Sequence, residues 1–277
     1  MDAVRLGPLI FPIQVALVVA SIVLANAVAA WFRRYRGIDP GPLLWKMVLA
    51  GFVVARLVFV WRHHAIYFSD PLSILDVRDG GFHALAGFIT AFIVGAELTR
   101  RAVPLRRPLI AAASAGFLLF AGGTVLNTAL TPAAAPLPTI DVRQRDGTSV
   151  PLRHFAGRPL VINLWATWCP PCRREMPAMM AAQQAHPDIT FVFVNQGESG
   201  ADIERYLAEH GLRMQNVVID PAKQLSARTG TSGYPTTLLY DAAGFLQQRH
   251  IGELSRATLE EKISGLRTAD AKPARAD

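Results

Sequence analysis

Cysteine and charge are both scarce in this chain of 277 residues. Only two cysteines are present, and charged residues make up 18% of the chain, whereas hydrophobic residues make up 51%. That balance is too apolar for an intrinsically disordered chain, and it is unlike the charge-rich composition of a coiled coil. No second cysteine pair or nearby histidine pair is present to complete a four-ligand zinc site. We therefore expect folded domains without a metal centre.

Acidic residues are scarce in the first half of the chain, so the net charge of +7 is unevenly distributed. Residues 1–138 hold twelve Lys and Arg but only six Asp and Glu, whereas the remaining residues hold sixteen and fifteen. The positive excess therefore falls among long apolar runs. Such a distribution is typical of membrane topology rather than of nucleic-acid binding. We expect no nucleic acid among the partners.

Four apolar runs predict an α-helical membrane domain over residues 1–130. Each approaches or reaches the roughly 17–25 residues that a spanning helix needs, and they cover about residues 9–32, 43–61, 81–98 and 108–130. The loops after the first and third runs are the most basic, which places both loops in the cytoplasm. The N-terminus and everything after Leu130 then lie outside. A signal peptide cleaved near Ala27 is the alternative for the first run.

The second to fourth runs resemble the central segment of prolipoprotein diacylglyceryl transferases, which are inner-membrane enzymes. The resemblance covers roughly residues 43–130. It rests on Ala55-Arg56-Leu57, on Ser69-Asp70-Pro71-Leu72 and on the stretch from Asp79 to Gly87. It implies a contact with membrane lipid, and it makes a lipid-modifying membrane protein with a redox accessory domain one alternative function.

Three residues of this half are candidates for a lipid site, namely Arg56, His83 and Asn127. His83 occupies the position of a functional histidine in the transferases. The arginine of their later Gly-Arg-x-Gly-Asn signature is missing, because residues 122–127 read Gly-Gly-Thr-Val-Leu-Asn. In the alternative interpretation, Arg56 snorkels towards the outer interface and His83 makes a hydrogen bond at the end of its span.

A spacer and an α/β domain are predicted after the membrane domain. Residues 131–138 contain three prolines and no periodicity, which is typical of an extended linker. Strand and helix patterns then alternate over residues 139–267, and a polar tail follows over 268–277. We expect strands near 159–166, 189–195, 215–219, 235–240 and 247–251, with helices over 173–185, 201–210 and 257–266.

The two cysteines stand together as Cys169-Pro170-Pro171-Cys172, between a strand and a helix. A C-x-x-C pair at such a junction predicts a thioredoxin-like redox motif. A structural disulfide is a poor alternative, because closing so short a loop stabilises little. The helix N-terminus favours the thiolate form of Cys169, so we expect an exposed nucleophile there and a less exposed resolving thiol at Cys172. The pair itself would serve in place of a cofactor.

The stretch from Asn163 to Pro177 closely resembles the TlpA/ResA group of membrane-tethered periplasmic thiol-disulfide oxidoreductases, and the resemblance extends over residues 139–267. It implies a thioredoxin-like fold with a cis-proline at Pro235 and a functional glutamate at Glu175. The alternatives are an ordinary proline at a strand start and a first-turn glutamate favoured by the helix dipole. Around the cysteines we expect a substrate-binding surface made of Trp168, Pro170, Pro171, Tyr234 and Thr236.

The membrane half has no cysteine, so it cannot carry electrons across a membrane by thiol exchange. The resemblance therefore implies an external donor of the DsbD or CcdA type. It also implies clients among oxidised periplasmic proteins, such as apocytochrome c or copper-site proteins. The Pro-Pro dipeptide favours a disulfide reductase, with a thiol oxidant on the same scaffold as the alternative. We expect a multi-pass protein of the bacterial inner membrane, with its redox domain in the periplasm.

Overall fold

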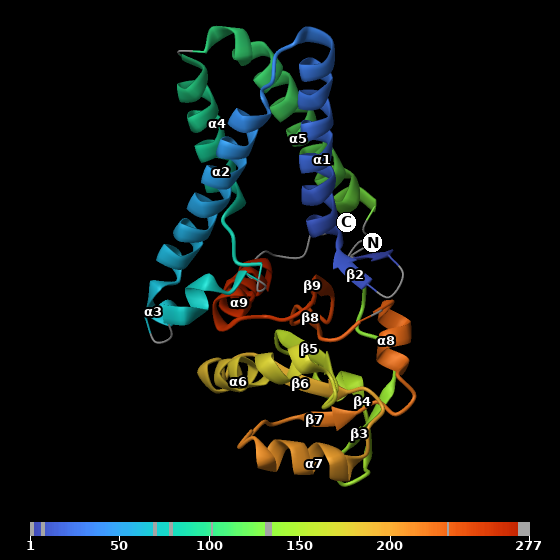
Figure 1. Ribbon diagram of the computed structural model, residues 1–277. Helices are drawn as coiled ribbons and strands as arrows, with labels where there is room; N and C mark the ends of the chain where they lie inside the picture. Colours follow the sequence, from blue (N-terminus) through green and yellow to red (C-terminus); the bar gives the residue numbers. More distant parts are fainter. Residues whose placement is uncertain are drawn as a thin grey trace. The chain divides into compact units, whose positions relative to one another are not determined.

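The computed structural model describes residues 3–6, 9–68, 71–77, 80–100, 102–130, 135–231 and 233–270. These residues form two compact units, one holding residues 3–130 and the other residues 135–270 (Figure 1). Each unit has its own core and is described separately.

The first unit is built from four long helices, together with a short hairpin and two small helices. The long helices are α1 (Ile13–Arg36), α2 (Gly41–Arg62), α4 (Ala84–Arg100) and α5 (Val103–Leu130). The smaller elements are β1 (Ala3–Leu6), β2 (Leu9–Pro12), α3 (His64–Tyr67) and η1 (Pro71–Leu75). Among the described residues, α1, α2 and α5 are the three helices long and apolar enough to cross a membrane. Helix α4 has 17 residues, at the lower limit for a spanning helix.

Prolines account for two differences from the predicted spans. The first helix begins at Ile13 rather than near residue 9, and residues 9–12 pair with β1. Pro12 explains this start, because the residue before a proline is disfavoured in the helical region. Helix α5 begins at Val103, five residues before the predicted start, and it continues through Pro108. Pro104 suits the first turn of this helix, where no backbone N–H is needed.

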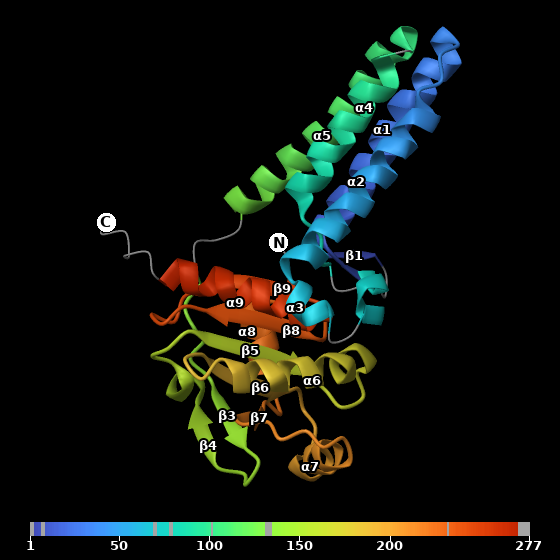
Figure 2. The same ribbon diagram turned by 90° about the vertical axis from the view of Figure 1, so that its left-hand side faces the viewer.

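The long helices associate as two pairs, α1 with α5 and α2 with α4 (Figure 1). Figure 2 shows the unit turned so that the two pairs overlap. Small residues permit this close approach. A Cβ atom on Gly87 would lie 3.0 Å from the carbonyl oxygen of Gly51, and a Cβ atom on Gly116 would lie 2.9 Å from that of Ser21. Close backbone contact through small residues is the usual way in which membrane helices pack.

The second unit contains a seven-stranded sheet in the order β4-β3-β7-β6-β5-β8-β9. Strands β5, β6 and β7 run parallel, whereas β8 is antiparallel to β5 and to β9. The strands are β3 (Asp141–Gln144), β4 (Ser149–Pro151), β5 (Leu160–Trp165), β6 (Thr190–Asn195), β7 (Val217–Ile219), β8 (Thr236–Tyr240) and β9 (Leu246–Ile251). The helices are η3 (Leu152–Phe155), α6 (Pro170–Ala185), α7 (Gly200–Glu209), α8 (Gln224–Thr229) and α9 (Arg256–Asp270).

Strand β5 is buried at all six positions because both faces of the sheet are covered. Val161 and Trp165 join the core that α6, α7 and α9 complete, whereas Ile162 and Leu164 join the core that contains residues of α8 and η3. Asn163 falls between Val161 and Trp165 in the alternation of the strand, so it faces the same side as α6. Strand β5 thus places a polar side chain on the face covered by the helix that carries the cysteines.

The predicted spacer and tail both need correction. Part of the spacer is docked on the second unit, because Leu137 donates to the Gly244 carbonyl (2.8 Å) and Leu246 donates to that of Ala135 (2.9 Å). Residues 131–134 lie outside the described residues. At the other end, α9 continues to Asp270 instead of ending near residue 266, so helix occupies the start of the predicted tail. Residues 271–277 lie outside the described part.

Candidate active site

The cysteine pair lies at the N-terminus of α6, at the end of the sheet where β5 finishes. Cys169 is the N-cap residue of this helix and forms a disulfide with Cys172. The backbone N–H of Cys172 points at the sulfur of Cys169, with a distance of 3.3 Å between N and Sγ. Pro170 and Pro171 occupy the first turn, where their missing N–H groups need no partner.

Both cysteines are buried, and Cys169 is less exposed than the sequence predicts. Cys169 is 3% exposed and Cys172 is 0% exposed. The relative order is as predicted, but the expected exposed position of Cys169 is wrong for this disulfide form. The physical reason is that the sulfur of the N-cap residue turns back over the helix end, where both cysteines join the core that contains Trp165.

The surface beside the disulfide combines an exposed aromatic ring with the loop before β8. Trp168 is 62% exposed, and its ring lies 6.2 Å from that of Tyr234 in an edge-on arrangement. The Tyr234–Pro235 peptide bond is cis, which confirms the predicted conformation. Because Thr236 pairs with Leu164 in the sheet, this loop lies at the same end of β5 as the cysteines.

The other predicted surface residues differ in exposure. Pro170 is exposed and Pro171 is partly buried. Thr236 is 0% exposed, and its hydroxyl donates to the Gly233 carbonyl at 2.7 Å. The expected place of Thr236 on the substrate-binding surface is therefore wrong for its side chain. The side chain is buried and makes its hydrogen bond to the loop that carries the cis-proline.

Glu175 is a buried carboxyl one turn after Cys172 on α6, and it is 1% exposed. Its Oε1 accepts a hydrogen bond from Asn163 Nδ2 (2.8 Å), and its Oε2 accepts one from the backbone N–H of Leu254 (3.0 Å). Burial raises the pKa of Glu175 from 4.5 to about 8, against the smaller lowering effect of these two bonds. In this disulfide form the carboxyl therefore holds a proton near neutral pH.

Asn163 connects this carboxyl to the sheet. Its Nδ2 also donates to the hydroxyl of Thr237 on β8 (3.2 Å), while its Oδ1 is buried without a hydrogen-bond partner in the described structure. Thioredoxin-like proteins with an aspartate at this position would place a second carboxyl here. The asparagine instead supplies an N–H donor to Glu175, a contact that sequence reasoning did not assign.

The loop between β9 and α9 supplies three contacts to the site that the sequence does not predict. The N–H of Gly252 donates to the Pro235 carbonyl (2.9 Å). Arg174 donates to one carboxylate oxygen of Glu253 through Nε (2.9 Å) and Nη2 (2.6 Å). The N–H of Leu254 makes the bond to Glu175 described above. Gly252 has a φ of +111°, a conformation that favours glycine.

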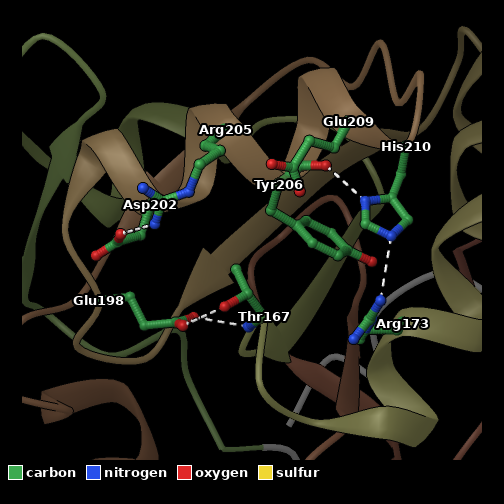
Figure 3. Close-up of a pocket in the computed structure, with 8 residues that line it drawn as sticks. All are labelled: Thr167, Arg173, Glu198, Asp202, Arg205, Tyr206, Glu209 and His210. Atoms are coloured by element: carbon green, nitrogen blue, oxygen red, sulfur yellow. Dashed lines mark hydrogen bonds and ion pairs between the residues drawn. The ribbon is translucent and has the colours of Figure 1, made fainter.

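A second group of side chains supports the segment before Cys169 (Figure 3). Glu198 accepts hydrogen bonds from the backbone N–H of Thr167 (2.7 Å), from the Thr167 hydroxyl and from Asn195 Nδ2 (2.6 Å). Nearby, Arg173 lies 3.1 Å from His210 Nε2 (Figure 3). Glu198, Arg173 and His210 line a pocket of about 260 Å³ beside the cysteine motif. Glu198 also holds the backbone two residues before Cys169.

Arg56 in the first unit is buried rather than directed towards water. It is 7% exposed, and its guanidinium donates to the carbonyls of Ser73 (3.1 Å), Ile74 (3.1 Å), Asp76 (2.8 Å) and Gly81 (2.9 Å). The guanidinium is thus held by protein carbonyls of the segment between α2 and α4, and the snorkelling alternative for Arg56 stays a prediction. It satisfies four backbone carbonyl groups of this segment, which would otherwise need partners inside the protein.

His83 lies at the end of the loop that Arg56 holds. Its Nδ1 lies 3.2 Å from the backbone N of Ala86, and its Nε2 lies 3.1 Å from Arg62 Nη1. The alternative interpretation of His83 as a hydrogen-bonding residue fits these contacts. Asn127 lies on α5, whereas Arg56 is on α2. Ser69, Asp70 and Asp79 of the transferase-like pattern lie outside the described residues.

Comparison with known proteins assigns the second unit. Residues 132–265 match the Redoxin family. The thiol:disulfide interchange protein HelX of Rhodobacter capsulatus is 30% identical over 137 residues, which are 50% of this chain and 71% of HelX. The chain belongs to the thiol-disulfide oxidoreductase family. The oxidoreductase ResA of Halalkalibacterium halodurans is 30% identical over 118 residues, which are 42% of this chain and 66% of ResA.

A solved structure of a thiol:disulfide interchange protein DsbE from Chlorobium tepidum is also similar. It is 26% identical, with a TM-score of 0.45, and the match covers 49% of this chain and 97% of that one. The predicted membership of the TlpA/ResA-like oxidoreductases is thus confirmed by the sequence relatives. The resemblance of the first unit to the transferases stays a prediction. Within the described residues, no group of three or more potential metal ligands is present.

Proposed function

We propose that this oxidoreductase is tethered to the bacterial inner membrane and reduces disulfides of exported proteins on the periplasmic side. The observation that carries the proposal is the cysteine pair at the N-terminus of α6, with the buried Glu175 carboxyl one turn behind it. The helix end favours a thiolate at Cys169, and the carboxyl provides a nearby group that can exchange a proton with Cys172.

The reduction of a client begins at Cys169. Its thiolate attacks one sulfur of the client disulfide, so the client S–S bond breaks while a mixed disulfide forms. The other client sulfur leaves as a thiolate and takes a proton from water. Trp168, Pro170 and Tyr234 provide the surface on which the client lies, and Pro235 presents its backbone beside it.

Cys172 completes the reaction. Its thiol transfers a proton to the Glu175 carboxylate, and its sulfur attacks Cys169 in the mixed disulfide. The bond between Cys169 and the client breaks, the Cys169–Cys172 disulfide forms, and the second client sulfur leaves as a thiolate. Two electrons have then passed to the client. The proton remains on Glu175, whose raised pKa suits the oxidised form.

An external dithiol reduces the Cys169–Cys172 disulfide again. When one donor thiolate attacks Cys169, a mixed disulfide forms, and Cys172 leaves as a thiolate and recovers the proton from Glu175. The second donor thiolate then attacks the donor sulfur bonded to Cys169, so Cys169 leaves as a thiolate and the donor keeps the disulfide. We propose a membrane thiol transporter of the DsbD or CcdA type as the donor, because the first unit contains no cysteine. Apocytochrome c and copper-site proteins are the proposed client classes.

Membrane insertion is proposed for all four long helices. Their outward side chains are apolar, with exposed fractions of 62% for Val23, 76% for Phe92 and 67% for Leu118. The basic connections around Arg34 and Arg106 are proposed to face the cytoplasm. This topology leaves the second unit outside, in the periplasm, where disulfides persist.

Trapping tests the proposed function directly. In cells that express Cys172→Ser, the mixed disulfide at Cys169 cannot be resolved, so a covalent adduct with the client should accumulate. The matched control is the Cys169→Ser, Cys172→Ser double variant, which should form none. A reductase also requires its clients to accumulate in the oxidised form when Cys169→Ser replaces the native chain. Clients that accumulate reduced would instead identify a thiol oxidant.

A further inference from the structure

Three consecutive residues of the loop between β9 and α9 hold three parts of the active site. We call residues 252–254 the strap. Its first residue binds the carbonyl of Pro235, its second binds Arg174, and its third donates its backbone N–H to Glu175. The strap therefore contacts both the cis-proline loop and the buried carboxyl.

Consecutive residues of α6 face consecutive residues of the strap. Arg174 and Glu175 bind Glu253 and Leu254, respectively. Neighbouring residues on a helix point about 100° apart, so the first bond lies at the surface and the second in the core. The side chains of Arg174 and Glu253 are 45% and 17% exposed, whereas Leu254 is 1% exposed. The ion pair between Arg174 and Glu253 thus lies on the solvent side of the buried hydrogen bond from Leu254 to Glu175.

Loss of the ion pair would open this edge to water. Glu175 has two protein donors, Asn163 and the N–H of Leu254, and the strap provides one of them. Water that reached the carboxyl would stabilise its ionised form, because burial is the main reason that its pKa is raised. The same movement would weaken the bond from Gly252 to the Pro235 carbonyl.

We propose that Arg174 and Glu253 are positioning residues for thiol-disulfide exchange, because their ion pair holds the strap against Glu175 and Pro235. The pair acts through the strap and does not contact the reacting sulfurs. This inference rests on the proposed role of Glu175 in proton transfer. It adds to that role an ion pair at the surface. This pair keeps water away from the Glu175 carboxyl and links the carboxyl to the cis-proline loop, where a client binds.

The charged groups around Glu175 decide how the test is interpreted. Arg174 on α6 contributes a positive charge. Glu253 on the strap contributes a negative charge, and this negative charge raises the pKa of Glu175. From β9, His250 places Nε2 3.4 Å from the Glu253 carbonyl oxygen. Burial and the charge of Lys262 on α9 lower the pKa of His250 to about 4, so it is neutral at working pH.

The remaining contacts of Glu175 are neutral. Asn163 approaches from β5, and Thr237 on β8 touches only that asparagine. A shift in the ionisation of Glu175 after a change at Arg174 or Glu253 therefore comes from one of two sources. It reflects either the altered charge of the pair or the release of the strap.

Two substitutions separate these sources. The change of charge and the release of the strap shift the pKa of Glu175 in opposite directions in Arg174→Gln, but in the same direction in Glu253→Gln. In Arg174→Gln, the lost positive charge raises the pKa of Glu175, whereas release of the strap lowers it, because hydration of the carboxyl outweighs the loss of the Leu254 hydrogen bond. In Glu253→Gln, both effects lower the pKa. The proposal therefore expects both variants to shift the pKa downwards, by about one unit, which is a tenfold change in the ratio of protonated to ionised carboxyl.

The measurement uses the full-length oxidised protein in lipid nanodiscs. The carboxyl band of Glu175 is followed by infrared difference spectroscopy across pH, and its assignment comes from Glu175→Gln. In parallel, the rate of exchange between the reduced protein and a disulfide-linked fluorescent peptide is recorded over the same pH range. Arg267→Gln is the matched control, because it breaks the ion pair with Asp188 elsewhere on the same unit.

The outcomes are distinct. Downward shifts in both variants, with slower peptide exchange and an unchanged control, support the proposal. Opposite shifts in Arg174→Gln and Glu253→Gln, or no shift in either, overturn it. The exchanged pair Arg174→Glu with Glu253→Arg should restore the native profile. If Glu175→Gln itself leaves exchange unchanged at every pH, the proposed proton transfer has failed independently of the strap.

Discussion

The buried carboxyl of Glu175 should make the stability of the oxidised second unit depend on pH. Its pKa rises from 4.5 to about 8 on folding, so the folded form keeps a proton that the unfolded chain releases. Over that interval the free energy of unfolding falls by about 1.4 kcal/mol for each pH unit. The stabilisation is present at low pH and is lost as the pH rises towards 8.

His250 acts in the opposite direction over part of this interval. Burial is the main reason that its pKa falls from 6.5 to about 4, so between these values the unfolded chain binds a proton that the folded form does not. Stability then rises with pH at about the same slope, and the two effects nearly cancel between pH 4.5 and 6.5. From pH 6.5 to 8 the Glu175 effect stands alone, which gives a loss of about 2 kcal/mol.

The assay is guanidinium unfolding of residues 132–277 at intervals between pH 5 and 9, with the disulfide intact. The native unit should show a plateau and then a decline above pH 6.5. Glu175→Gln should rise up to pH 6.5 and stay level afterwards. Parallel curves for the two proteins between pH 6.5 and 8 would refute the reasoning, because Glu175 would then not ionise in that range.

Three further predictions concern local structure. Gly252→Ala should lower the free energy of unfolding of the second unit by about 1–2 kcal/mol, because the backbone has a φ of +111° there; guanidinium unfolding at pH 6 measures it. Arg56→Lys should lower the thermal denaturation midpoint of the full-length protein in detergent, because an ammonium group cannot serve four carbonyls, while Arg62→Lys at an exposed position should not. Gly87→Leu should separate α2 from α4, as a loss of crosslinking between cysteines introduced on these helices would show; Gly122→Leu is the control, because nothing lies within 4 Å of its added Cβ.

The sequence predicts the central elements of the second unit because their signals are local. Strand β5 is a near-continuous apolar run, and the cysteine motif marks the start of α6. The hairpin of β3 and β4 is missed, since only Val142 is fully buried along these two short strands. Helix α8 is missed too, because its six residues carry no apolar periodicity.

The sequence predicts only those parts of the candidate site whose residue types belong to a recognisable motif. The cysteines, Pro235 and Glu175 can be proposed from the motif and the family resemblance. The contacts that set the environment of Glu175 come from residues up to 79 positions away, and one of them is a backbone N–H. Arg56 shows the same limit, because the carbonyls that it binds lie 17 to 25 residues further along the chain.

The bond from Leu254 to Glu175 has a consequence for how this site can vary. The donor is a peptide group, so every residue except proline supplies it. Side chains of similar size at position 254 would keep both the donor and the core packing. The hydrogen bond at this position depends on the backbone conformation and not on the side chain. Comparison of residue identities among relatives would therefore not reveal it. Replacing the amide of Leu254 by an ester through chemical synthesis would isolate that contribution.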